Sequence, residues 1–170
     1  SVRLFILSDS PPEKDIQWSD EGIVASFKFI QKLWSLHLKI LEQINKNNNN
    51  DIDQELARFT NQFIKKISTG LENFNYNIII ANMHEMNSLL NKIIDKGYSK
   101  KTILENYKKI LIAIMPVLPH LSNECLSSIG EQDKIEWPKF DEKKIEEDKN
   151  LVVIQINGKK RGLLEVKKNL

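Results

Sequence analysis

The residues able to perform catalysis are few in this chain, and their spacing does not bring them together. The three histidines, His37, His84 and His120, are far apart, and none belongs to an H-E-x-x-H motif. The single cysteine, Cys125, has apolar neighbours in a predicted helix, which favours an inert buried thiol over a nucleophile. The sequence also lacks a C-x-x-C pair and a glycine-rich phosphate loop. We therefore expect no catalytic residue, no cofactor site and no metal site within this segment.

Basic side chains are the second set of candidate functional residues, because several of them on one surface can bind the phosphates of RNA. The chain has 25 lysine and arginine residues against 23 acidic ones, and its formal net charge is +2. This balance does not by itself indicate nucleic-acid binding, so the charges would have to cluster. Basic residues adjoin one another at 65–66, 100–101, 108–109 and 159–161. A lysine pair on a helix is more often only a solvated face, so each cluster alone is a weak signal.

Two long amphipathic helices are predicted to position the first of these charges. The earlier helix begins at Ser19 or Asp20, both of which can cap a helix, and ends near Asn45. Its predicted buried stripe consists of Ile23, Phe27, Ile30, Trp34, Leu38 and Leu41, and its opposite face carries Lys28, Lys32 and Lys39. The stripe of the next helix consists of Ile52, Leu56, Phe59, Phe63, Ile67, Leu71 and Phe74, with Arg58, Lys65 and Lys66 off the stripe.

Three shorter helices complete the predicted bundle. One spans about residues 78–95, and the next begins with a T-x-x-E capping box at 102–105. Prolines at 116 and 119 must break or kink that helix, and a short helix follows over 119–129. Each of these segments again carries its apolar residues at a helical spacing.

The two ends of the chain have a different character. Residues 2–7 are an apolar run that fits either a strand or the end of a buried helix. Residues 131–150 form a charged connector, and the β-branched segment 151–156 is followed by Asn157-Gly158, a strong two-residue hairpin turn. The predicted fold class is therefore mainly α, an antiparallel helical bundle with a short C-terminal β-hairpin. Because an isolated hairpin is marginally stable, this one must pack against the bundle or against further chain.

Composition limits the cellular location that we expect for the protein. No run of about 18 apolar residues occurs, so we expect no membrane-spanning segment. One cysteine excludes an internal disulfide and suits a reducing compartment, which favours a cytoplasmic location.

Four segments, in order along the chain, resemble bacterial leucyl-tRNA synthetases, a family of class I aminoacyl-tRNA synthetases. SPPEKDIQWSDEG at 10–22 is similar to the family segment that follows the KMSKS loop, and KKISTGLENFNYN at 65–77 is similar to a family helix and corner. MPVLPHLSNECL at 115–126 resembles a third landmark. Residues 135–166, which include QINGKKRG, resemble the fourth, so the likeness covers nearly the whole chain.

The resemblance implies a C-terminal piece of such an enzyme, with an anticodon-binding-type helical domain. Residues 1–20 would link it to a missing catalytic domain, 21–130 would form the tRNA-binding bundle, 131–150 a connector, and 151–170 a hairpin that begins a truncated C-terminal domain. The intact enzyme would ligate leucine to tRNA(Leu) in protein biosynthesis, with ATP and Mg bound in the missing domain. The HIGH and KMSKS signatures of that domain are absent here.

The resemblance also implies tRNA(Leu) and the enzyme's own catalytic domain as partners of a monomer. The residues that we expect to contact tRNA are Lys65 and Lys66 first, then Arg58, Lys159, Lys160 and Arg161. Contact with the RNA backbone and shape is expected rather than reading of anticodon bases. Where the family usually has His-Lys, this chain has Asn61-Gln62, so one phosphate-facing lysine of the family is missing.

Two alternatives stay open, one for the role of Trp18 and one for the function of the bundle. Trp18 precedes a helix cap, where we expect it to staple the loop onto the bundle rather than to stack on a base. The alternative function is a helical protein–protein interaction module without RNA binding, which the near-neutral net charge supports.

Overall fold

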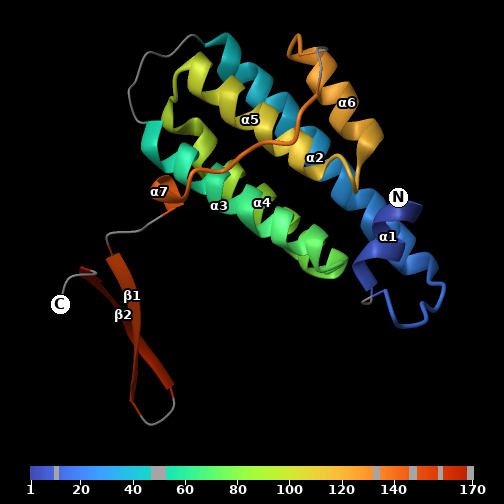
Figure 1. Ribbon diagram of the computed structural model, residues 1–170, viewed down its shortest axis with the longest axis horizontal. Coiled ribbons are helices and arrows are strands. Elements are labelled where there is room, and N and C mark those ends of the chain that lie inside the picture. The colour runs from blue at the N-terminus through green and yellow to red at the C-terminus, as the bar shows by residue number, and fades with distance from the viewer. Residues whose placement is uncertain (10–11, 47–52, 132–134, 146–148, 157–158, 168–170) are drawn as a thin grey trace. The chain divides into compact units, whose positions relative to one another are not determined.

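Helices form most of the chain, and the predicted mainly helical fold is confirmed (Figure 1). The computed structural model describes residues 1–9, 12–46, 53–131, 135–145, 149–156 and 159–167. The chain forms two compact units, Ser1–Phe140 and Asp141–Leu170. The helices of the first unit are α1 (Val2–Asp9), α2 (Asp20–Asn45), α3 (Asp53–Glu72), α4 (Tyr76–Ile93), the 3-10 turn η1 (Ile94–Lys96), α5 (Lys100–Ile114) and α6 (Pro119–Ser128). Within the described residues, none of these helices is long and apolar enough to cross a membrane.

Serine side chains fix the beginnings of α2 and α5. The Ser19 hydroxyl accepts a hydrogen bond from the Gly22 N–H at 3.1 Å, which confirms one of the two predicted caps. The predicted capping box at 102–105 is wrong, because the Ser99 hydroxyl caps α5 by accepting from the Thr102 N–H at 3.2 Å. Thr102 is therefore already inside the first turn, and the helix begins three residues earlier than its T-x-x-E pattern indicates.

The predicted buried stripe of α2 is wrong at three of its six residues, whereas Ile23, Ile30 and Leu41 are half-buried, and Ile30 and Leu41 pack partly against the core. Phe27, Trp34 and Leu38 are exposed to 51%, 38% and 47% of their surface. The buried face of α2 is instead formed by Ser26, Phe29, Leu33, Leu36, His37, Ile40, Gln43 and Ile44. Apolar residues occupy two faces of this helix, so the three- to four-residue spacing fits either face equally well.

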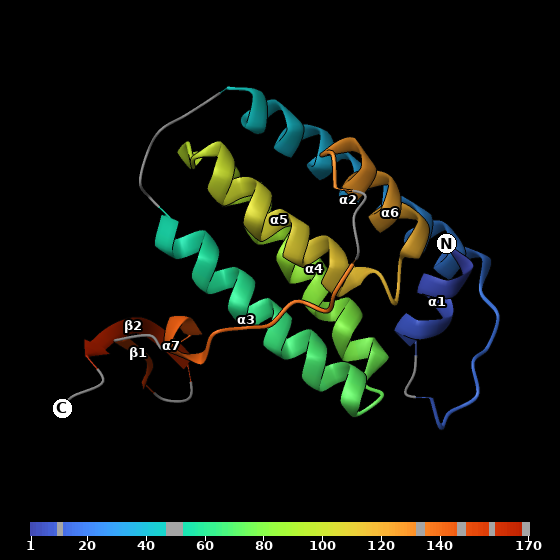
Figure 2. The ribbon, with the colours of Figure 1, turned by 45° about the horizontal axis from the view of Figure 1, so that its top comes forward.

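The predicted stripe of α3 is buried over its central turns. Leu56, Phe63 and Ile67 are almost fully covered, and Phe59 and Leu71 pack partly against the same core. Helix α3 lies against both α4 and α5 (Figure 2). Contact with α4 is so close near the end of α3 that a Cβ atom at Gly70 would lie 2.7 Å from Cγ1 of buried Ile79.

The corner after α3 explains why Phe74, the last residue of the predicted stripe, is exposed and not buried. Ile52, the first residue of that stripe, lies outside the described residues. The Phe74 N–H donates to the Leu71 carbonyl at 3.2 Å, and the Asn75 N–H donates to the Gly70 carbonyl at 2.8 Å. These two bonds close a Schellman motif, whose central residue adopts a left-handed conformation. Phe74 occupies that position with φ 55°, so its ring leaves the helix stripe.

Residues 2–9 form helix α1, which resolves the choice between strand and helix within the segment predicted as a linker. Leu4 and Phe5 are buried, and α1 packs on α2 and α4. A Cβ atom at Gly22 would collide with the Phe5 ring, so the glycine allows this approach. Trp18 meets the Phe5 ring edge-on at 5.9 Å, as a staple would, although 62% of Trp18 stays exposed.

A hydrogen-bond chain centred on one buried histidine joins α2 to α5 and α6. His37 is fully buried, with Nδ1 2.9 Å from the Tyr107 hydroxyl and Nε2 2.8 Å from the Ser128 hydroxyl. The Ser128 hydroxyl donates to the Cys125 carbonyl at 2.8 Å, so it accepts from His37, and Tyr107 donates to the other ring nitrogen. Burial lowers the pKa of His37, against a smaller opposing effect of Glu124, which favours the neutral ring that this hydrogen-bond pattern requires.

The connector 135–140 crosses the bundle to α3 (Figure 2). The Trp137 indole N–H donates to the Ser68 hydroxyl at 3.0 Å, Pro138 is buried, and Phe140 packs partly against the core. These contacts hold the connector against the side of α3 that carries Ser68. The predicted connector is therefore a packed segment of the first unit over residues 135–140.

The second unit contains α7 (Glu142–Ile145) and the strands β1 (Lys149–Ile156) and β2 (Lys159–Lys167). The strands pair antiparallel, with a register irregularity between Ile154 and Gln155. The predicted Asn157-Gly158 turn lies outside the described residues.

Candidate nucleic-acid interface

The side of α3 that faces away from the core carries three of the residues predicted to bind tRNA. Arg58 and Lys65 are seven residues apart, two helical turns, and therefore lie on the same side of the helix. Lys66 follows one residue later and faces about 100° away from Lys65. Both lysines are exposed and Arg58 is half-buried. We call Arg58, Lys65 and Lys66 the α3 face.

Lys66 and Lys65 each have a contact within the first unit. The Lys66 ammonium lies 3.4 Å from the Glu85 carboxylate of α4, and both side chains are largely exposed. An exposed ion pair of this kind contributes roughly 0–1 kcal/mol. The Lys65 ammonium lies 5.8 Å from the centre of the Phe140 ring, which the connector brings to α3. An exposed cation–π contact adds about 0.5–1 kcal/mol, and the exposed ion pair at Lys66 is a weak contact that RNA could replace.

Arg58 lies one turn after an acidic residue of the same helix. Glu55 pairs with Lys96 at 2.6 Å and accepts a hydrogen bond from the Tyr98 hydroxyl at 3.0 Å. The Lys96 hydrogen bond is the main cause of the lowered pKa of Glu55, and Arg58 adds a small Coulombic contribution in the same direction. The positive field of Arg58 is thus partly neutralised by its own neighbour.

Lys159, Lys160 and Arg161 begin strand β2 in the second unit. Their backbone is described, whereas their side chains lie outside the described part of the chain. Arg58, Lys65 and Lys66 lie on one helix of the first unit, and Lys159, Lys160 and Arg161 lie on one strand of the second unit.

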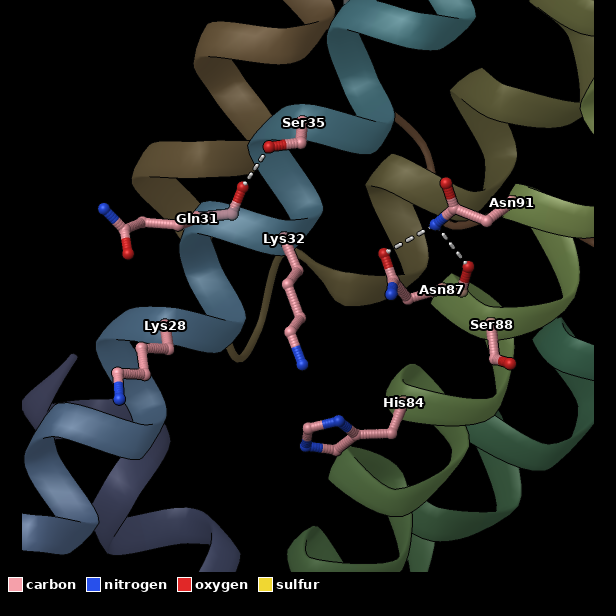
Figure 3. Close-up of a pocket in the computed structure, with 8 residues that line it drawn as sticks. All are labelled: Lys28, Gln31, Lys32, Ser35, His84, Asn87, Ser88 and Asn91. Atoms are coloured by element: carbon pink, nitrogen blue, oxygen red, sulfur yellow. Dashed lines mark hydrogen bonds between the residues drawn. The ribbon is translucent and has the colours of Figure 1, made fainter.

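A groove between α2 and α4 is the basic site that the sequence analysis did not select (Figure 3). Its volume is about 730 Å³. Helix α2 contributes Lys28, Gln31, Lys32 and Ser35, and α4 contributes His84, Asn87, Ser88 and Asn91. We call these eight residues the α2–α4 groove.

Both walls of the groove repeat one polar pattern. On each helix the lining residues are spaced i, i+3, i+4 and i+7, the spacing of one helical face. Figure 3 shows Lys32 and His84 extending from the two helices into the space between them. The sequence already places Lys28, Lys32 and Lys39 on one face of α2. It does not show that the polar face of α4 lies opposite them, because this depends on how the two helices pack.

The two walls are held together at one end of the groove by Lys39. Its ammonium donates to the Asn91 carbonyl at 2.9 Å and pairs with Asp95 at 2.7 Å, so it bridges α2 to the end of α4 and to η1. The His84 ring stacks on Phe29 of α2, with the ring centres 3.6 Å apart. Partial burial lowers the pKa of His84, and the nearby Lys32 ammonium lowers it further.

A family model described as "Anticodon-binding domain of tRNA ligase" matches residues 53–170, which is more than half of the chain. The chain therefore belongs to the anticodon-binding domain family of tRNA ligases. The described helices α3 to α6 all fall within the matched range.

The particular relatives are leucine–tRNA ligases. The enzyme named "Leucine--tRNA ligase" from Fervidobacterium nodosum is 35% identical over 98% of this chain and 22% of the relative. That of Orientia tsutsugamushi is 40% identical over 95% of this chain and 19% of the relative. The chain thus spans about a fifth of the length of these relatives.

A solved structure has the same fold. It is the ternary complex of Agrobacterium radiobacter K84 agnB2 LeuRS with tRNA and LeuAMS, and it superposes with a TM-score of 0.81. The likeness covers 99% of this chain and 23% of that chain at 23% identity. At this identity it supports the helical architecture and carries no residue-level assignment.

Proposed function

We propose that this chain is the tRNA-binding domain of a leucine–tRNA ligase and that it holds tRNA(Leu) by its backbone and shape. The observation that carries the proposal is the set of relatives named leucine–tRNA ligase, which are 31–40% identical over at least 95% of this chain. Membership of the anticodon-binding domain family agrees with it. Rigid helices that carry lysines supply the kind of surface that recognises folded RNA through phosphates.

The reaction itself is proposed to take place in another part of a longer protein. The chain spans about a fifth of its relatives, so a catalytic domain that uses leucine, ATP and Mg would lie outside it. This segment would add tRNA affinity and orientation, with that domain as its covalently joined partner. We further propose a cytoplasmic monomer in which β1 and β2 form the hairpin that begins a small C-terminal domain.

The proposed phosphate contacts are Lys65 and Lys66 first, with Arg58 and residues 159–161 as additional contacts. Each lysine that neutralises a phosphate releases a counterion, so affinity should fall steeply as salt rises. The weak contacts of Lys65 with Phe140 and of Lys66 with Glu85 leave both ammonium groups on the surface, where RNA can replace those contacts.

Titration of the 170-residue chain with labelled tRNA(Leu) tests this function. We expect binding at about 50 mM salt that weakens by a factor of ten or more at about 200 mM. The double variant Lys65→Glu/Lys66→Glu should bind at least about tenfold more weakly. The charge-matched control is Lys100→Glu/Lys101→Glu, at the start of α5, where acidic residues suit the helix dipole.

Two results would count against the proposal. Salt-independent binding, or an unchanged affinity of the Lys65/Lys66 variant, would remove the α3 face as the contact surface. Absence of tRNA binding at low salt, together with capture of a defined protein partner, would favour the protein–protein interaction module instead.

A further inference from the structure

We propose that the α2–α4 groove is a separate contact site for the ribose–phosphate backbone of a nucleic-acid strand, with Lys28 and Lys32 as its phosphate contacts. This assignment rests on the tRNA-binding function proposed for the chain and names a surface that the α3 face does not include. The groove lies between two helices of the first unit, and its walls are both described.

Charge is the first observation that supports the groove. Its eight lining residues include two lysines and no carboxylate, although the chain has 23 acidic residues. Neither Lys28 nor Lys32 has an ion-pair partner among the described residues. A phosphate entering the groove would therefore meet two exposed ammonium groups without first displacing an acid.

Spacing is the second observation. Lys28 and Lys32 stand four residues apart, so their Cβ atoms are about 6 Å apart on one helix face. Along the opposite wall, Asn87, Ser88 and Asn91 present amide and hydroxyl groups at the matching helical positions. Such groups and lysines are the usual partners of phosphate and sugar oxygens, and they fix position without reading bases.

The side chains that line the groove can all hydrogen-bond a ligand through their ends. Each of the eight carries an ammonium, amide, hydroxyl or imidazole group, and such groups bind the oxygens of a ribose–phosphate backbone. The Lys39 bridge to Asn91 and Asp95 fixes the separation of the walls, and the His84–Phe29 stack fixes the ring of His84 inside it. A pre-formed polar groove lowers the entropy cost of binding.

The test compares full-length variants of this chain in tRNA(Leu) titrations at about 50 mM and about 200 mM salt. Lys28→Glu/Lys32→Glu should weaken binding at least about tenfold, and Lys28→Gln/Lys32→Gln should lower the slope of log affinity against log salt by about 2. The charge-matched control, Lys100→Glu/Lys101→Glu, should keep its affinity within about twofold of the parent chain. Far-UV circular dichroism checks that every variant keeps its helices.

A second measurement reads the groove directly, through the NMR pH titration of His84 with and without inorganic polyphosphate. An anion bound beside Lys28 and Lys32 should raise the pKa of His84, because a nearby negative charge favours the imidazolium. The His84 titration should stay unshifted by polyphosphate in the Lys28→Glu/Lys32→Glu variant.

The outcomes separate this inference from the proposed function. If tRNA binds the parent chain but the groove variants bind within twofold of it, the groove assignment is overturned and the tRNA-binding function stands. Should the parent chain fail to bind tRNA, the function falls, and the polyphosphate measurement decides whether the groove is a phosphate site. A His84 pKa that polyphosphate leaves unchanged overturns the groove in either case.

Discussion

Helices α2 and α3 are the two longest of the described chain, and they differ in how their apolar faces are buried and in what their lysines contact. On α3 the single apolar stripe is buried as its spacing indicates, and the lysines of the outer face contact Glu85 and Phe140. On α2 the apolar residues occupy two faces, and the face chosen from spacing is only partly covered, with Phe27, Trp34 and Leu38 exposed. Its lysines at 28 and 32 have no ion-pair partner among the described residues. Charge counted along a sequence is therefore a poor guide to the charge that a ligand can reach.

The way in which each helix is fixed in the bundle differs as well. Helix α2 is joined to α5 and α6 by the hydrogen bonds of one buried histidine, His37. Helix α3 is fixed by close contact, with Gly70 against Ile79 of α4. This contrast leads to different expectations for substitutions on the two helices.

His37→Ala should have the largest effect, with a loss of roughly 2–4 kcal/mol in the free energy of unfolding. The change leaves the buried Tyr107 hydroxyl without its ring partner, at about 1–3 kcal/mol for an unsatisfied group, and opens a cavity, whereas the exposed Ser128 hydroxyl keeps its bond to the Cys125 carbonyl. Urea unfolding measures the loss. The control is His120→Ala, since His120 is exposed and should change the free energy by less than about 0.5 kcal/mol. Equal effects at the two positions would show that α2 does not depend on this hydrogen-bond chain.

Gly70→Ala should destabilise the protein by roughly 1–3 kcal/mol, although alanine is the better helix former. The new Cβ atom would lie 2.7 Å from the side chain of the fully buried Ile79, so the packing between α3 and α4 would have to shift. Thr69→Ala, on the exposed neighbour, is the matched control and should gain a few tenths of a kcal/mol from helix propensity. A stabilised Gly70→Ala protein would mean that α3 and α4 are less closely packed than described.

Acid should weaken the attachment of α2. Because the pKa of His37 is lowered in the folded state, the unfolded chain binds more protons below about pH 6.5, the ordinary histidine value. The stabilising contribution is therefore complete above that pH and is lost as pH falls toward the lowered pKa. Urea midpoints at pH 7.5 and pH 5.5 measure the loss, which should be smaller in His37→Gln; an identical pH dependence in that variant would contradict the assignment.

The smallest expected effect concerns the α3 face. Glu85→Gln removes the partner of Lys66, so affinity for tRNA should rise about two- to threefold, the size of an exposed ion pair. Glu105→Gln, whose carboxylate lies 3.9 Å from Lys101 on α5, is the matched control and should leave affinity unchanged. An identical rise in both variants would point to net charge rather than to Lys66 itself.

The sequence predicted where the helices lie along the chain better than which face of each helix is buried. Residues such as Leu56, Phe63 and Ile67 form one stripe, so spacing alone places them in the core. Helix α2 has two apolar faces, and only its neighbours decide which one is covered. The cap at Ser99 was missed because Thr102 and Glu105 imitate a capping box one turn too late. Phe74 was misplaced because spacing carries no information about the left-handed residue that ends α3.

The candidate site was predictable only in part. Lys65, Lys66 and Arg58 were correctly placed on one helix, but the contacts of the two lysines come from α4 and from the connector. The α2–α4 groove needs two polar faces from segments separated by about fifty residues, and no local pattern states that they meet. His37 looked like an ordinary helical histidine, and its two partners lie 70 and 91 residues later.

The surface position of the tryptophans has a spectroscopic consequence. Trp18, Trp34 and Trp137 are the three tryptophans of the chain, and all are exposed. Indoles in contact with water already emit at long wavelength in the folded protein, so the emission maximum should shift little on unfolding. The same property makes each one a local fluorophore, with Trp34 on α2 and Trp137 hydrogen-bonded to α3. Chains that keep one tryptophan would report separately, by quenching or anisotropy, on events at the two helices.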